Sequence, residues 1–98
     1  MTIEKIANGT ELTVNLAGRL DTTTAPPLEA EMQASIPGVE KLVMDFAALE
    51  YLSSAGLRVL LASHKAMSKQ GKMVIKNVNE TISEIFDVTG FSDVLNIE

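Results

Sequence analysis

Two adjacent serines, Ser53 and Ser54, are the residues of this chain whose type and position could support chemistry. They stand in the run Leu52-Ser53-Ser54-Ala55-Gly56, between an apolar segment and an amphipathic one. A hydroxyl at a helix start lies among backbone N–H groups that lack intrahelical partners, at the positive end of the helix dipole. That position tolerates negative charge and suits a serine that is phosphorylated and later dephosphorylated. From spacing alone, the simpler alternative is that one serine only caps the helix.

A catalytic role for Ser54 would require a general base within hydrogen-bond reach. The one histidine, His64, follows on the same predicted helix and is therefore about 15 Å away, at 1.5 Å of rise per residue. The G-x-S-x-G pattern of a nucleophile elbow and the Gly-rich loops that bind nucleotides are absent. With no cysteine and a single histidine, the chain is a poor candidate for a metal site. The sequence therefore predicts a non-enzymatic protein without metal or cofactor.

Asp21 is a second candidate, because it follows a half-buried predicted strand in the run Gly18-Arg19-Leu20-Asp21. Loop carboxylates most commonly serve as capping or turn groups. Alternatively, Asp21 could lie near Ser54 at the carboxyl edge of a parallel sheet, where ligand sites are favoured. There it could hydrogen-bond to a serine or to a partner, and the residues alone leave both roles open.

Hydrophobic periodicity predicts the elements that position these residues. Alternating apolar residues indicate a hairpin around Asn8-Gly9, and the threonines 22–24 form a capping stretch ahead of a helix. Gly71 is expected to end the second helix as its C′ residue. The predicted elements are strands at 3–6 and 11–17, a helix from Pro26-Pro27 to about Pro37, a strand at 41–46, a helix from Ser53-Ser54 to Gly71, a strand at 72–76, a helix capped by Asn79 or Asn77 and ended by Gly90, and a short strand at 94–97.

The order β-β-α-β-α-β-α-β predicts an α/β fold with a mixed central β-sheet and packed helices, forming a single domain over residues 1–98. Hydrophobic residues make up 46% of the chain and aromatic residues only 4%, so the core must consist mainly of aliphatic side chains and methionine. Four methionines fall at positions expected to lie in that core: Met32, Met44, Met67 and Met73.

The formal net charge of −5 indicates what the chain does not bind. Proteins that bind nucleic acids need a basic surface to neutralise phosphates, and none is expected here. No apolar run approaches the ~20 residues of a membrane span, so membrane insertion is not expected. The start of the chain lacks the basic and apolar regions of a signal peptide. We therefore expect a soluble, cytoplasmic domain.

Four landmarks make the chain resemble the STAS domain of bacterial anti-sigma-factor antagonists over essentially its full length. The serine-glycine turn with the strand before it is the most specific of them, and the others fall in the expected order. The landmarks are Gly18-Arg19-Leu20-Asp21, the segment Val43-Met44-Asp45-Phe46 with Leu49-Glu50-Tyr51-Leu52, the turn Ser53-Ser54-Ala55-Gly56-Leu57, and Phe86-Asp87-Val88-Thr89-Gly90-Phe91.

The resemblance implies the STAS fold and a function in partner switching. The unphosphorylated antagonist binds an anti-sigma factor that is also a serine kinase, which frees the sigma factor. Phosphorylation of a serine at the helix start breaks the complex, and a serine phosphatase resets it. The rival reading is a STAS subunit that docks a transporter ATPase or a signalling scaffold without being phosphorylated.

By the same resemblance, Ser54 takes the position of the phosphoacceptor and Asp21 that of the loop aspartate beside it. Well-studied members often carry Asp where this chain has Ser53, which leaves a choice between the two serines, and we favour Ser54. The expected partner-binding residues are Asp21, Thr22, Ser53, Ala55, Gly56 and Arg58.

Overall fold

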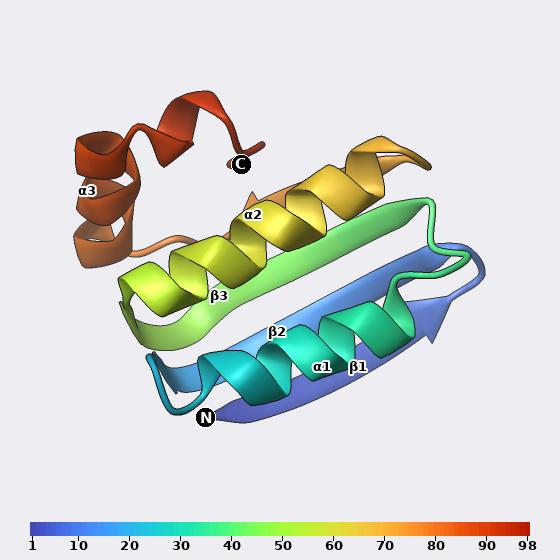
Figure 1. Cartoon of the computed structure of the whole chain (residues 1–98), viewed down its shortest axis with the longest axis horizontal. Coiled ribbons are helices and arrows are strands. Elements are labelled where there is room, and N and C mark those ends of the chain that lie inside the picture. The colour runs from blue at the N-terminus through green and yellow to red at the C-terminus, as the bar shows by residue number, and fades with distance from the viewer.

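The computed structural model describes residues 1–98 and confirms the predicted α/β fold class. Three helices connect or follow the strands of one mixed sheet, and a short 3₁₀-helix lies near the C-terminus (Figure 1). The elements are β1 (Thr2–Asn8), β2 (Glu11–Leu20), α1 (Ala25–Ser35), β3 (Lys41–Leu52), α2 (Ser54–Ser68), β4 (Lys72–Lys76), α3 (Glu80–Thr89) and η1 (Phe91–Asp93).

The sheet has the strand order β1-β2-β3-β4, so that neighbours in sequence are also neighbours in space. β1 pairs with β2 in antiparallel fashion, as expected of a hairpin, whereas β2 with β3 and β3 with β4 are parallel. Figure 1 shows α1 and α2 side by side across one face of this sheet, with α3 set apart at one end. The parallel strands β2, β3 and β4 therefore run in the same direction, and β2 and β3 end side by side, at Leu20 and Leu52.

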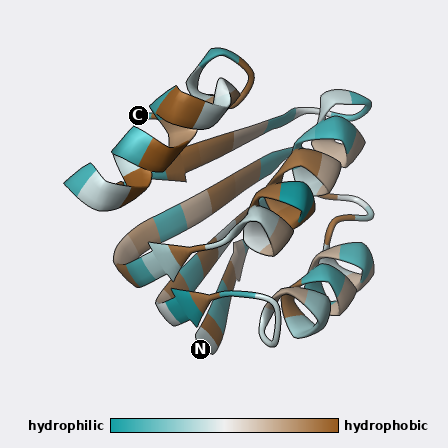
Figure 2. Ribbon diagram, turned by 60° about the vertical axis from the view of Figure 1, so that its left-hand side comes forward, coloured by the Kyte–Doolittle hydropathy of each residue, from teal (hydrophilic) through white to brown (hydrophobic).

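The core lies between the sheet and its helices, and the strand register aligns the apolar side chains that form it. Val14 pairs with Met44, which in turn pairs with Ile75, and all three side chains are fully buried. Three consecutive residues are buried in each of the two strands β3 and β4, Leu42 to Met44 and Met73 to Ile75, and Figure 2 shows the central strands largely in the hydrophobic colour. All four methionines that the sequence placed in the core are buried. At about 25 cal/mol per Å², burial of such side chains is the main force that holds the helices on the sheet.

β1 and β2 extend the predicted strands by a few residues, and two further strands differ more from the sequence prediction. β3 continues from the predicted end at residue 46 to Leu52, because it stays paired with β2 through two register shifts. The strand expected at 94–97 is reduced to one parallel bridge, between Ile75 and Ile97. The 3₁₀-helix lies just before that segment, and the turn that follows it, in which the Leu95 N–H bonds to the Phe91 carbonyl, occupies the first two residues of the segment.

Gly71 serves a different purpose from the one predicted. Its φ is not positive, so it is not a left-handed C′ residue. Instead, a β-carbon at Gly71 would come within 1.8 Å of the Glu40 carbonyl oxygen. That carbonyl accepts a hydrogen bond from the Lys72 N–H at 3.0 Å. Glycine is required here by the close approach of two backbone segments at the start of β4.

Candidate functional site

The two candidate segments meet because β2 and β3 end side by side. Leu20, the last residue of β2, is in register with Leu52, the last residue of β3. The residues that follow them, Asp21 and Ser53, therefore begin neighbouring loops at one sheet edge. The Ser53 N–H donates to the Leu20 carbonyl at 2.9 Å and ties the two loops together.

Ser53 and Ser54 have different roles at the start of α2. Ser53 is the N-cap residue, with extended backbone, and its hydroxyl accepts a long hydrogen bond of 3.4 Å from the Gly56 N–H. Ser54 is the first helical residue, its side chain is exposed, and its hydroxyl forms no hydrogen bond within the protein. The cap is therefore supplied by one serine, which leaves the hydroxyl of the other free for modification.

Gly56 allows this turn to sit directly on the sheet. It is buried, and a β-carbon at this position would lie 2.7 Å from Leu20 Cγ and 2.7 Å from Leu52 Cδ1. Real β-carbons do not approach other carbon atoms so closely, since van der Waals contact between carbons begins near 3.5 Å. The absence of a side chain at Gly56 thus sets the height of Ser54 above the strand ends.

Asp21 is held within its own loop. Its Oδ1 accepts hydrogen bonds from the Thr23 hydroxyl at 2.7 Å and the Thr23 N–H at 3.0 Å, with longer ones from Thr24. The hydrogen bond from the Thr23 side chain is the largest cause that lowers the pKa of Asp21 below its usual value. Asp21 forms no hydrogen bond to Ser53 or Ser54, so the turn-group role that the sequence left open is the one realised in the free protein.

The threonines after Asp21 organise the loop rather than capping α1. Thr24 is the N-cap residue by position, yet its side chain forms no capping bond. Its hydroxyl instead donates to the Arg19 carbonyl at 2.8 Å and accepts from the Asp21 N–H at 2.8 Å. These bonds fix the loop against the end of β2, which leaves Thr22 and Thr23 at the surface.

A shallow hollow of about 190 Å³ brings several predicted binding residues together. Thr22 contributes from the Asp21 loop, and Ala55 and Arg58 contribute from the first turns of α2. Arg58 is exposed and stands one helical turn beyond Ser54, on the same side of α2. Both loops therefore share one accessible surface, which includes Thr22, Ala55 and Arg58.

Sequence reasoning missed a cation–π pair beside this surface. The guanidinium carbon of Arg19 lies 4.2 Å from the centre of the Tyr51 ring, and the two residues are in register across β2 and β3. The Arg19 Nε is also 3.9 Å from Asp21 Oδ2. A signal was present, because Arg19 and Tyr51 each stand two residues before Asp21 and Ser53 on the adjacent strands. Tyr51 is exposed and adds an aromatic contact to the site.

His64, the one histidine, does not hydrogen-bond to Ser54. His64 lies on the same helix, as predicted, and its Nδ1 is buried without a hydrogen-bond partner. No group of three or more His, Cys, Asp or Glu residues is placed so that it could hold a metal ion. None of the helices has the length and apolar character needed to cross a membrane.

The chain belongs to the STAS domain family, whose family model matches residues 2–98. A putative anti-sigma factor antagonist of Bordetella bronchiseptica, BtrV, is 34% identical over 84 residues, which cover 84% of this chain and 72% of BtrV. The anti-sigma-B factor antagonist of Bacillus subtilis is 30% identical over 91 residues, covering 92% of this chain and 84% of that protein. The resemblance expected from the sequence landmarks is thereby confirmed.

Solved structures agree with this assignment. An anti-sigma factor antagonist from Mycobacterium paratuberculosis superimposes with a TM-score of 0.89 at 25% identity, covering 98% of this chain and 83% of that one. The Bacillus protein SpoIIAA in its phosphorylated form gives a TM-score of 0.77 at 17% identity, covering 99% of this chain and 91% of that one. At that identity the second comparison establishes the shared fold.

Proposed function

We propose that residues 1–98 form a single STAS domain that acts as a cytoplasmic, non-enzymatic anti-sigma factor antagonist. In its unphosphorylated form it binds an anti-sigma factor that is also a serine kinase, which releases the sigma factor. Phosphorylation of Ser54 ends that binding, and a serine phosphatase restores it. The observation that carries the proposal is the free, exposed hydroxyl of Ser54 at the first position of α2, beside a cap already supplied by Ser53. Two relatives at 30% identity or more are named as antagonists of this kind.

The position of Ser54 suits a phosphate in the free domain. A phosphoryl group adds about −1.5 to −2 charge at pH 7. The first N–H groups of a helix have no intrahelical acceptors, and here those of Ser54 and Ala55 stay free, whereas Gly56 donates to the Ser53 hydroxyl and Ser53 to the Leu20 carbonyl. The helix dipole and the cation of Arg58, one turn away, both favour negative charge here. The free domain therefore holds the phosphate without rearrangement.

The same phosphate opposes binding to a partner. A partner that covers the start of α2 must accommodate both the volume and the charge of the new group. A clash or an unpaired buried anion costs several kcal/mol, which corresponds to an affinity loss of about 100-fold or more. The switch then needs no conformational change in the antagonist.

The direct test is to incubate the protein with ATP and its cognate serine kinase, and to map the phosphate by mass spectrometry. We expect one phosphate, on Ser54. The absence of Ser54 modification by any co-encoded kinase contradicts the proposal. Capture of a transporter ATPase in place of such a kinase supports the architectural alternative.

A further inference from the structure

The basic residues of this chain differ in whether they pair with a carboxylate. Four of the eight lie within 4 Å of a carboxylate, in the pairs Lys5–Glu31, Arg19–Asp21, Lys41–Glu11 and Lys76–Glu98. The other four, Arg58, Lys65, Lys69 and Lys72, form no ion pair and all lie on α2 or just after it. No Asp or Glu occurs between Glu50 and Glu80 in a chain that has thirteen of them. The acidic domain thus has one face of unpaired positive charge.

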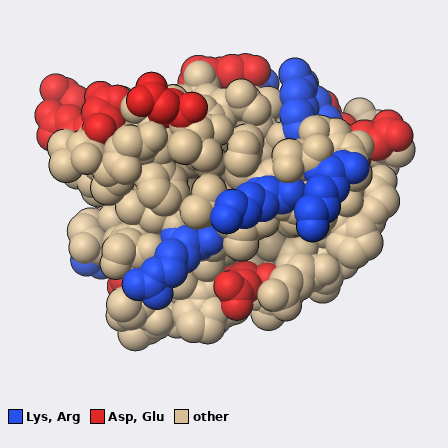
Figure 3. Space-filling view, turned by 45° about the horizontal axis from the view of Figure 1, so that its top comes forward, with Lys and Arg blue, Asp and Glu red and all other residues tan.

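These cations form a line along the outer side of α2. Arg58, Ala62, Lys65 and Lys69 follow one another at intervals of four, three and four residues, and all are exposed. That spacing places them on one helix face, over about 16 Å from the first to the last. Figure 3 shows the line of blue side chains across this face, with red side chains mostly at its margins. We call Arg58, Lys65 and Lys69 the α2 cation row.

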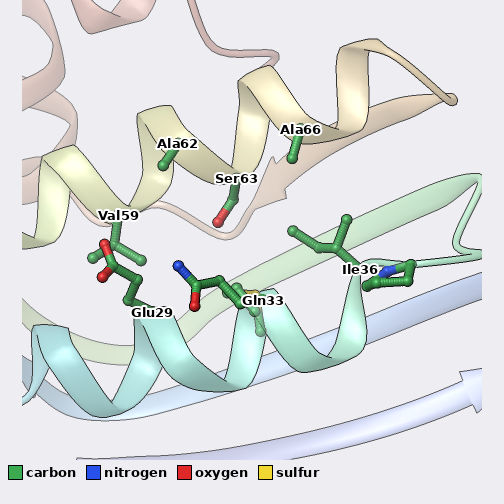
Figure 4. A pocket seen from close by; sticks show the side chains of 9 residues that line it. Glu29, Gln33, Ile36, Val59, Ala62, Ser63 and Ala66 are labelled. Carbon is green, nitrogen blue, oxygen red and sulfur yellow. The ribbon is translucent and has the colours of Figure 1, made fainter.

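An apolar groove of about 370 Å³ runs beside the α2 cation row, between α1 and α2. Its α2 bank is made of small residues, so the space between the two helices is left unfilled (Figure 4). Met32 and Ile36 contribute apolar surface from α1. Ala62 belongs both to the groove and to the exposed face that carries the cations. The residues of the α2 bank are Val59, Ala62, Ser63 and Ala66.

The two banks of the groove carry opposite charge. The α1 bank carries Glu29, and α1 contains no Lys or Arg. The α2 bank carries the cation row, and α2 contains no Asp or Glu. An extended polyanion, such as a nucleic acid or an anionic membrane surface, would meet Glu29 and the overall charge of −5. A helix with an apolar stripe and acidic residues along only one side matches both banks.

We propose that this groove docks an amphipathic helix of a partner protein, of two to three turns, with its apolar stripe between α1 and α2 and its acidic side against the α2 cation row. Helix-in-groove binding of this kind uses apolar anchors one turn apart, with charges that fix the orientation. The net negative charge elsewhere on the domain disfavours binding of the same acidic helix at other surfaces.

The groove connects physically to the start of α2. Ser54 lies one turn before Arg58 on the exposed side that carries the row. A phosphate on Ser54 would neutralise Arg58 in part and repel an acidic helix at that end of the groove. Assigning the docked helix to the anti-sigma factor rests on the proposed function, whereas the groove and its charge pattern do not.

The first experiment tests the groove without any natural partner. The probe is a synthetic 15-residue helical peptide with Leu and Ala on one face, Glu along one flank and Lys along the other. NMR titration of the ¹⁵N-labelled protein should shift the amides of Val59, Ala62 and Ala66. The double variant Lys65→Gln/Lys69→Gln should bind about tenfold more weakly. The matched control Lys41→Gln/Lys76→Gln changes the net charge equally and should bind within about twofold of the wild type.

Three results would overturn the groove assignment. The first is that the amides do not shift with about 1 mM peptide. The second is that a scrambled peptide of the same composition gives equal shifts. The third is that duplex DNA or phosphatidylglycerol vesicles give stronger shifts in the α2 cation row than the peptide does. Ala62→Phe, which fills the groove, must also abolish peptide binding while the rest of the spectrum stays folded.

The second experiment tests whether the docked helix belongs to the anti-sigma factor. The two double variants are compared for binding to the cognate anti-sigma factor. Selective weakening in Lys65→Gln/Lys69→Gln assigns the helix to that factor, and equal binding of both variants refutes the assignment. If the wild-type protein does not bind that factor at all, the proposed function is wrong. The peptide titration still tests, independently, whether the groove binds an amphipathic helix.

Discussion

Gly56 lies directly against Leu20, so that a β-carbon on the glycine would come within 2.7 Å of the leucine Cγ. Leu20 is fully buried at the end of β2, and Gly56 is in the first turn of α2. Leu20 directly precedes Asp21, and Gly56 comes two residues after Ser54. This contact therefore links the loop of Asp21 to the turn of Ser54. The relative position of the two loops is therefore set by packing beneath them.

Gly56→Ala is expected to destabilise the fold, although alanine is the better helix former. The gain in helix propensity is about 1 kcal/mol. The overlap with Leu20 and Leu52 is in a packed region, where added methyl groups cost about 1–3 kcal/mol. We expect a net loss of about 1 kcal/mol in the free energy of unfolding, measured by urea denaturation. Ser54→Ala, in the same turn but exposed, is the control, and equal stability of the two variants would refute this packing argument.

Replacement of each serine by alanine separates the cap from the phosphoacceptor. Ser53→Ala removes the cap and should lower the free energy of unfolding by about 0.5–1 kcal/mol, while kinase treatment still adds a phosphate. Ser54→Ala should leave stability unchanged and abolish phosphorylation. Urea denaturation and intact-protein mass spectrometry measure the two properties independently. A phosphate that persists in Ser54→Ala and disappears in Ser53→Ala would reverse our assignment.

Charge at position 54 is expected to control partner binding. Ser54→Ala should bind the anti-sigma factor as the unphosphorylated protein does, at all times and regardless of ATP. Ser54→Asp should bind about 100-fold more weakly, because the partner must then cover an added negative charge. Ser54→Asn is the matched neutral control of nearly equal size. Isothermal calorimetry that gives Asp and Asn variants the same affinity would show that volume, not charge, operates the switch.

Asp21 is expected to make stability depend on pH in the acid range. Its pKa in the folded protein is lowered, first by the Thr23 hydroxyl, so its ionised form favours folding. This contribution is complete above the unfolded-state pKa of about 3.9 and is lost as the pH falls through the lower folded-state value. Asp21→Asn should therefore be less stable than the wild type at pH 6, with a difference that narrows below about pH 4. Parallel pH profiles of the two proteins, from urea denaturation, would argue against this role.

Most of the framework could be predicted because it follows from local periodicity and local turns. Leu12, Val14 and Leu16 alternate as a half-buried strand must, and each is buried. Of the two predicted caps of α3, Asn77 and Asn79, the structure uses Asn79, whose side chain accepts a hydrogen bond from the Ile82 N–H at 2.8 Å. Such signals involve residues a few positions apart, which a single sequence displays.

The features that were missed depend on residues far apart in the sequence. The extension of β3 beyond residue 46 has no alternating pattern, since it rests on irregular pairing with β2. The requirement for Gly71 comes from the backbone of Glu40, thirty-one positions earlier. The contact between Arg19 and Tyr51 is visible only once the strand register is known. At the site, the family resemblance favoured Ser54 over Ser53 as the phosphoacceptor, but only the structure shows that Ser53 supplies the cap.

The free hydroxyl of Ser54, which forms no bond within the protein, has a consequence for the timing of the proposed switch. Because the fold loses no hydrogen bond when that oxygen is modified, the domain has no broken contact to restore when the phosphate is removed. The lifetime of each state is then set by the rates at which the phosphate ester is formed and hydrolysed. The serine kinase and the serine phosphatase would then alone determine how long the domain stays in its binding and non-binding states.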